Sequence, residues 1–169
     1  MAGEPAERAG RRWRYALLGL LIIATGAALA APVGVLVASG GGQEIVVPLG
    51  DGEPFAYSYL QSVYQAPVKE EQERRANGFR ILRVRSPDRR AVEYFRWDGP
   101  VRRDGDAYVQ DAPPNEVPQL LIRTTAANDQ RLTGPSWSID LPARFGDEAL
   151  VRVRVGDLPR IIALVRARR

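Results

Sequence analysis

The chain has 169 residues and contains neither cysteine nor histidine. Without cysteine there are no disulfides and no thiolate nucleophile, and without histidine every imidazole-based triad and the usual zinc sites are excluded. The absence of cysteine is compatible with either redox compartment, so localisation has to come from other features. The sequence therefore predicts no metal site and no cofactor, and we expect a protein that is not an enzyme.

Lysine is almost missing, since Lys69 is the only one among 24 basic residues. A strong arginine bias of this kind is typical of a GC-rich genome, and we prefer that interpretation to a specific need for guanidinium groups. Four arginines precede the first apolar run, and the remaining 20 basic and 18 acidic residues nearly balance. This balance does not favour a nucleic-acid-binding surface.

The longest apolar run covers residues 16–38 and contains no charged side chain. As a helix it would measure about 34 Å, against a hydrocarbon core of about 30 Å. Trp13, Tyr15 and the arginines before them are typical of a cytoplasmic flank. The sequence thus predicts a cytoplasmic N-terminus at 1–15, a membrane anchor at 16–38, a glycine-rich linker at 39–43 and an exported domain at 44–169.

A cleaved signal peptide is the alternative interpretation of this segment. Residues 17–28 could form its apolar region, and Ala28-Leu29-Ala30 has the small-x-small form of a cleavage site. Cleavage near Ala30 would release a secreted protein, but the mature chain would then begin with the apolar residues 31–38. A buried core helix is the weakest interpretation, because a glycine-rich stretch follows the run. The first two interpretations both place the domain outside the cytoplasm.

The remaining residues contain short apolar runs separated by turn signals such as Asn77-Gly78 and Gly146-Asp147. Several short strands at this spacing predict an all-β domain, a small antiparallel β-sandwich or barrel. The clearest strand is 149–156, in which Val151, Val153 and Val155 alternate with arginines. The expected strands are 44–49, 55–63, 79–86, 91–97, 107–110, 119–125, 136–141, 149–156 and 160–167.

Residues 68–76 carry mixed signals. A proline before the segment and acids in its first turn are typical of a helix start, and Asn77-Gly78 could end the helix. However, only Val68 and Ala76 could form an apolar stripe, so a helix would have little to bury. We therefore predict a strand that pairs with 55–63.

The stretch YLQSVYQAPVKEE, residues 59–71, is the candidate site, and a strand, a turn and a second strand is its simplest interpretation. A second hypothesis is that Tyr59, Gln61, Ser62 and Glu70 converge on a small polar ligand. A third hypothesis pairs Glu70 with Glu93 or Asp140 for carboxylate-dependent hydrolysis. It is the weakest, because any chain with 20 acidic residues offers such pairs.

This stretch resembles the signature of a bacterial family of domains of unknown function, often encoded beside TRAP transporters of the TAXI type. That signature has a Tyr-x-His-Ser-Val run, then a Pro-Val pair and a glutamate. The matching residues here are Tyr59, Ser62, Val63, Pro67, Val68 and Glu70, while Gln61 replaces the histidine. The resemblance extends roughly over 45–155, and GPSWSIDLPARFGDEALVRVRV is similar to the family's closing pattern, whereas RAVEYFRWDGP departs from it.

The resemblance implies an exported domain with a transporter subunit as a possible partner. Because an amide does not titrate, Gln61 favours a binding or structural role over catalysis at this position. We therefore expect an accessory or ligand-binding module held at a lipid bilayer by residues 16–38. The alternatives are a structural envelope domain that binds a protein partner through a sheet edge and, least favoured, a hydrolase. The oligomeric state is not predicted.

Overall fold

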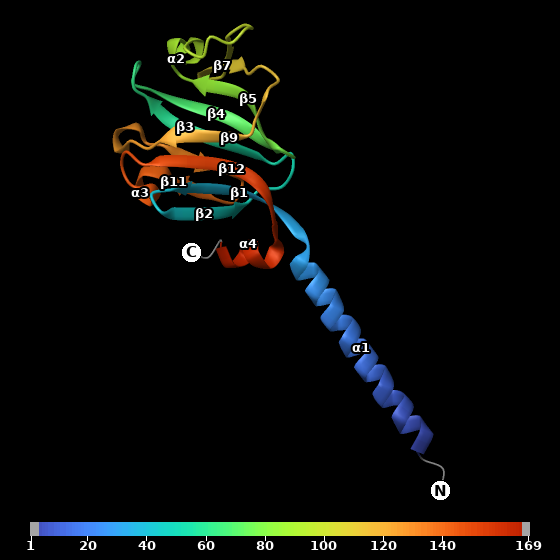
Figure 1. Ribbon diagram of the computed structural model, residues 1–169. Helices are drawn as coiled ribbons and strands as arrows, with labels where there is room; N and C mark the ends of the chain where they lie inside the picture. The colour runs from blue at the N-terminus through green and yellow to red at the C-terminus, as the bar shows by residue number, and fades with distance from the viewer. Residues whose placement is uncertain (1–3, 167–169) are drawn as a thin grey trace.

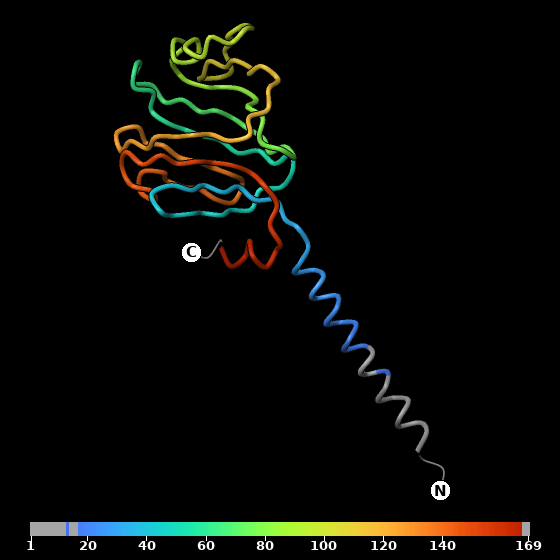
Figure 2. Tube along the Cα trace, in the orientation of Figure 1, coloured from blue at the N-terminus to red at the C-terminus, as the bar shows by residue number. Residues whose placement is uncertain are grey.

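A computed structural model describes residues 4–166, although between 4 and 16 the only described side chain is that of Trp13. A long N-terminal helix leads into a β-rich domain (Figure 1). The Cα trace shows the same arrangement, with the helix extending away from the domain (Figure 2). The elements are α1 Glu4–Ala30, β1 Pro32–Gly40, β2 Gln43–Pro48, β3 Pro54–Gln61, β4 Ala66–Arg75, β5 Gly78–Ser86, α2 Arg89–Glu93, β6 Arg102–Asp104, β7 Ala107–Asp111, β8 Glu116–Val117, β9 Gln119–Arg123, η1 Ala126–Asn128, β10 Arg131–Thr133, β11 Ser138–Asp140, α3 Leu141–Phe145, β12 Leu150–Pro159 and α4 Arg160–Arg166.

The strands form two sheets in which the neighbouring strands are antiparallel. The smaller sheet has the order β2-β1-β12-β9, and the larger has the order β11-β10-β3-β4-β5-β7-β6, with β8 paired to β5. We call them the small sheet and the large sheet. The predicted antiparallel all-β domain is thereby confirmed.

The main core lies between the two sheets. Leu36 and Val153 reach it from the small sheet, and Phe55, Phe79 and Leu132 reach it from the large sheet. Burying one such side chain contributes about 1.5–3 kcal/mol, so this shared core holds the two sheets together. The domain is therefore sandwich-like.

A second core covers the part of the large sheet near α2. Val68 and Val84 of β4 and β5 pack against Ala91 and Val92 of α2. The predicted strand at 91–97 is wrong, because Arg89–Glu93 form helix α2. Asp88 precedes α2 and accepts a hydrogen bond from the backbone N–H of Arg90, which satisfies one of the free donors at the start of a helix.

The predicted extent of the membrane helix is also wrong, because α1 ends at Ala30 and residues 32–40 form strand β1. Pro32 cannot donate a helical hydrogen bond, and the valines that follow favour a strand. The strand is apolar on both faces because Leu36 faces the main core, while Val35 and Val37 belong to a separate cluster that includes Ala163 of α4. Such a strand lacks polar alternation and is easily mistaken for the end of an apolar helix.

The predicted linker at 39–43 is the tight connection between β1 and β2. Gly41 and Gly42 adopt φ values of 55° and 77° there, which other residues rarely adopt. The β domain consequently begins at Pro32 and not at residue 44. Among the residues described, there is no helix with the length and apolar character needed to cross a membrane.

The prediction of a strand at 68–76 is confirmed by β4, which pairs with β3 on one side and β5 on the other. Alternate residues of β4 are buried, and three of them are polar: Glu70, Gln72 and Arg74. The sequence shows no apolar stripe here because the inward face of this strand is itself largely polar.

The final predicted strand, 160–167, is wrong, since Arg160–Arg166 form helix α4. Strand β12 ends at Pro159, and the next backbone N–H, that of Arg160, donates to the Ala31 oxygen at 3.0 Å. The chain thus leaves the sheet beside the end of α1, and α4 lies at the same end of the domain as α1 (Figure 1).

Candidate functional site

The β3–β4 hairpin brings three of the four predicted site residues to one face. In its register Tyr57 lies opposite Glu70, Tyr59 opposite Val68, and Gln61 opposite Ala66. Because side chains alternate along a strand, Tyr59, Gln61 and Glu70 all belong to the inward face. Gln61 and Glu70 are buried, and Tyr59 is partly buried.

The fourth predicted residue, Ser62, lies in the turn between the two strands and is exposed. Its backbone oxygen accepts a hydrogen bond from Nε2 of Gln65 at 2.7 Å, and Gln65 adopts a φ of 51°. These features close a four-residue turn, so the predicted strand, turn and strand are confirmed. Ser62 is therefore separated from the inward face that carries Tyr59 and Glu70.

The carboxyl group of Glu70 has a raised pKa. Burial raises the pKa of its carboxyl from 4.5 to about 7, and a hydrogen bond with Tyr59 partly opposes this change. Burial likewise raises the pKa of Tyr57 to about 12 and raises that of Tyr59 further, with the Glu70 charge adding to the effect. The hairpin thus holds one carboxyl group that changes charge close to neutral pH.

The polar contacts continue from Glu70 into the rest of the domain. The rings of Tyr57 and Tyr59 stack with their centroids 4.8 Å apart. Nε2 of Gln130 donates to the hydroxyl of Tyr57 and to the Arg123 oxygen, each at 3.0 Å. We call Tyr57, Tyr59, Glu70 and Gln130 the polar seam, because they form a continuous path from β4 through β3 to the end of β9.

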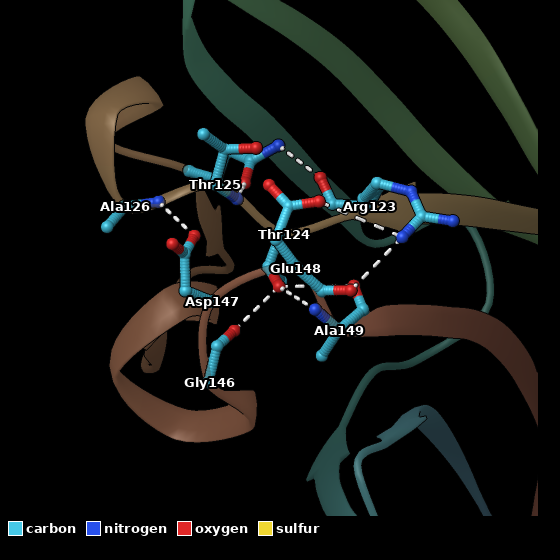
Figure 3. Close-up of polar contacts among 9 residues, drawn as sticks. Arg123, Thr124, Thr125, Ala126, Gly146, Asp147, Glu148 and Ala149 are labelled. Carbon is cyan, nitrogen blue, oxygen red and sulfur yellow. Dashed lines mark hydrogen bonds and ion pairs between the residues drawn. The ribbon is translucent and has the colours of Figure 1, made fainter.

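Beyond the polar seam, Thr124 ties the end of β9 to the loop before β12 (Figure 3). Its hydroxyl lies 2.6 Å from the Gly146 oxygen and accepts from the Ala149 N–H at 2.8 Å. Nearby, the Ala126 N–H donates to Oδ1 of Asp147 at 2.9 Å. Thr124 is fully buried, so these bonds replace the water that would otherwise satisfy both chain segments.

The two carboxylates that were considered as catalytic partners of Glu70 are engaged by local contacts. Glu93 accepts from Nε of Arg89 at 2.7 Å on α2. Asp140 accepts from the Ala143 N–H at 3.0 Å at the start of α3. Each of these contacts is local to its own helix. Within the polar seam, Glu70 is the member whose pKa lies close to neutral, whereas the pKa values of Tyr57 and Tyr59 lie far above it.

A concavity of about 540 Å³ opens at the tip of the β3–β4 hairpin. Its lining includes none of the four predicted site residues. The guanidinium carbon of Arg90 lies 5.1 Å from the centre of the Tyr64 ring, and Tyr94 meets the same ring edge-on at 6.3 Å. We call this surface the distal concavity; its lining consists of Tyr64, Gln65, Ala66, Pro67, Pro87, Asp88, Arg89, Arg90 and Tyr108.

Sequence reasoning missed most of the distal concavity. Tyr64 and Pro67 lie inside the quoted stretch, but residues 87–90 belong to the connection between β5 and α2. Only the packing of α2 beside β4 brings the two segments together. In the chain the arginine pair at 89–90 follows a proline and an aspartate, which is a helix-start signal and not a binding motif.

Helix α1 carries an exposed apolar surface. Six of its large aliphatic side chains are exposed by 54% to 70%, and the helix extends away from the domain (Figure 1). A helix that is apolar on all sides is normally covered by protein or lipid. These side chains are Leu17, Leu18, Leu20, Leu21, Ile22 and Ile23.

Comparison of the chain with protein-family models, with curated proteins and with solved structures gave no match.

Proposed function

We propose that this protein is a membrane-tethered, extracytoplasmic binding module. Helix α1 holds the β domain at a bilayer, and the distal concavity binds a protein partner. The observation that carries the proposal is the exposed apolar surface of α1 at one end of a folded domain whose opposite end carries the distal concavity (Figure 1).

The tether is supported by the cost of leaving the surface of α1 in water. Six large aliphatic side chains are more than half exposed on one helix, which far exceeds the scattered apolar residues of a typical soluble surface. A bilayer would bury them without requiring any contact with the β domain. The four arginines before Tyr15 favour a cytoplasmic start of the helix, which places the β domain on the other side.

Binding of a protein partner is supported by the shape and composition of the distal concavity. Small-molecule sites usually enclose most of their ligand, whereas this surface is open. Tyrosine and arginine are the residue types that most often contribute strongly to protein interfaces, and Tyr64, Arg90 and Tyr108 all line it. The resemblance described above makes a transporter subunit the first partner to look for.

The tether predicts that charges placed on α1 release the protein from membranes. The double substitution Leu21→Arg and Ile22→Arg should make the protein extractable, because each arginine at the centre of an inserted helix costs about 2.5–3.5 kcal/mol. Membrane fractionation with a carbonate wash measures the retained fraction. As controls, Val63→Arg and Leu121→Arg charge exposed apolar positions of the β domain and should leave retention unchanged. Retention of the charged α1 variant after the wash would refute the tether.

The binding surface predicts site-specific crosslinking. A photo-crosslinking phenylalanine derivative at Gln65, in the distal concavity, should give one discrete adduct in intact cells, and mass spectrometry should identify a transporter subunit in it. The same derivative at Asp51, an exposed position in the turn between β2 and β3, should give none. Arg90→Ala should weaken the adduct by removing the cation over Tyr64. Equal adducts at both positions, or none at Gln65, would contradict the proposed surface.

A further inference from the structure

We propose that α4 is a second membrane-contacting element, whose apolar face lies at the boundary between headgroups and acyl chains of a bilayer containing anionic lipid. This inference rests on the proposed insertion of α1. It extends the tether from one helix to a surface made by two segments that are far apart in the sequence.

Helix α4 is amphipathic. Four large aliphatic residues are exposed by 40% to 54% on this short helix. They fall within one arc of the helix, whereas Ala163 lies on the opposite side and packs toward Val35, Val37 and Val46 of the small sheet. The apolar face of α4 therefore points away from the domain. Its residues are Ile161, Ile162, Leu164 and Val165.

The apolar part of α1 is short. Residues 16–30 measure about 22 Å as a helix, which is shorter than a hydrocarbon core of about 30 Å. A short inserted segment draws its flanking residues toward the interface or thins the bilayer locally. The base of the β domain is then held at headgroup depth, directly after Ala30.

Helix α4 lies at that base of the β domain (Figure 1). Helix α4 contacts α1, and the Arg160 N–H at its start donates to the oxygen of Ala31, one residue beyond the end of α1. Any depth that α1 imposes on Ala31 is therefore imposed on the start of α4 as well. With the domain at headgroup depth, the exposed face of α4 meets the lipid surface.

Arginines flank the apolar face of α4. Arg160 and Arg166 bracket the apolar residues of α4, and Arg168 and Arg169 follow in the sequence. A groove of about 260 Å³ beside α4 is lined by Val35, Val37, Arg154 and Arg166, together with Glu44, Asp157 and neighbouring residues. The two carboxylates in this lining each accept from an arginine, Glu44 from Arg166 at 2.9 Å and Asp157 from Arg74 at 2.8 Å.

Apolar side chains bracketed by arginines are typical of helices that lie in the interface of anionic membranes. Arg160 would reach the phosphate groups while the aliphatic face enters the acyl boundary, and Arg166 neutralises Glu44 at the same surface. This chemistry favours a lipid surface over a second copy of the chain as the occupant of the exposed face.

The test uses the full chain, and because the chain contains no cysteine, a single introduced cysteine can be labelled specifically. The substitutions are Leu164→Cys in α4, Leu20→Cys in α1 and Val63→Cys at the hairpin tip, three exposed positions. Each variant is labelled with a fluorophore and reconstituted into phosphatidylcholine vesicles with or without phosphatidylglycerol. Quenching by nitroxide-bearing lipid is compared with quenching by aqueous iodide.

The expected result is lipid quenching at Leu20 and Leu164 that is several-fold stronger than at Val63. Omitting phosphatidylglycerol should lower the quenching at Leu164 and leave that at Leu20 unchanged. A label at Leu164 that is quenched only by iodide, while Leu20 is in lipid, would overturn the inference and leave the tether intact. Iodide quenching at both Leu20 and Leu164 would overturn the inference about α4 and the proposed tether as well. Protection of Leu164 from both quenchers, as in a contact between two copies, would also overturn it.

Discussion

Replacing Gly34 by alanine is expected to lower the free energy of unfolding of the β domain by about 3 kcal/mol, the upper end of the usual cost of overpacking. An added Cβ would lie 1.6 Å from Nη1 of Arg74 and 2.4 Å from the backbone oxygen of Leu49. The first contact cannot be relieved cheaply, because Arg74 is buried and its guanidinium is held in place. The second involves backbone, which moves only if a strand end moves.

The interactions of Arg74 explain why Gly34 has to be small. Arg74 comes from β4 of the large sheet, and its Nη1 donates to the Leu49 oxygen at 3.0 Å, just after β2. Its Nη2 donates to Oδ1 of Asp157 in β12 at 2.8 Å. The side chain therefore crosses from one sheet to the other, directly over Gly34 of β1. Moving it would leave a buried charge with fewer partners, which is strongly unfavourable.

Gly156→Ala is the matched control for Gly34→Ala. Gly156 lies in β12, its Cα is paired with that of Val35, and an added Cβ would meet nothing within 4 Å. This alanine should be neutral or stabilise by up to about 1 kcal/mol, because it restricts the unfolded chain. Urea unfolding of the full chain in mild detergent measures both variants, followed by tryptophan fluorescence, to which Trp97 and Trp137 of the β domain contribute. Equal midpoints for the two would show that Arg74 does not fill the space over Gly34.

The second large effect is expected from Glu70→Gln. The parent protein should lose about 3 kcal/mol of unfolding free energy as the pH rises through neutral, and the variant should not show this loss. In the unfolded chain the carboxyl has its ordinary pKa of 4.5, and in the folded protein burial raises it to about 7. Between these two pH values the folded state still holds a proton that the unfolded state has lost. Raising the pH therefore favours unfolding: the contribution is complete below pH 4.5 and is lost as the pH passes 7.

Glutamine keeps the shape of the side chain and is neutral at every pH, so the variant should be more stable than the parent above neutral pH. Its amide oxygen can still accept a hydrogen bond from Tyr59. Unfolding free energies measured in urea from pH 4 to pH 8 test the expectation, and Glu71→Gln provides the control. Glu71 is the next residue of β4, lies 3.3 Å from Arg83 and should retain the slope of the parent. If the unfolding free energy of the Glu70→Gln variant changed with pH as steeply as that of the parent, Glu70 would be excluded as the origin of the pH dependence.

Local sequence patterns predicted some elements correctly and others wrongly. The alternation of valine and arginine at 150–155 predicted β12 because a period of two is a local property of a strand. Strand β1 at 32–40 is apolar on both faces, and such a run has no period of two, so the sequence predicts the end of a membrane helix there. At 91–97 aromatic residues predicted a strand, although Asp88 three residues earlier is a recognisable helix cap.

Some contacts of the candidate site were predicted from the sequence, and others depend on the tertiary structure alone. Tyr59 and Glu70 were predicted to lie close together, and the hairpin register places them on one inward face. The contact of Tyr57 with Gln130 joins residues 73 positions apart, and no local signal predicts it. The distal concavity likewise depends on α2 packing beside β4, which brings Arg90 over Tyr64.

By itself the sequence determined the antiparallel β architecture, the hairpin at 59–71 and the apolar character of the segment before Ala30. These properties depend on side-chain periodicity and turn residues, which act over a few neighbours. Only the tertiary structure decided that 32–40 is a central strand, that Glu70 is buried, and that α4 lies beside α1. These outcomes depend on what covers each face, and a run of apolar or polar residues is the same in sequence whether protein, lipid or water lies against it.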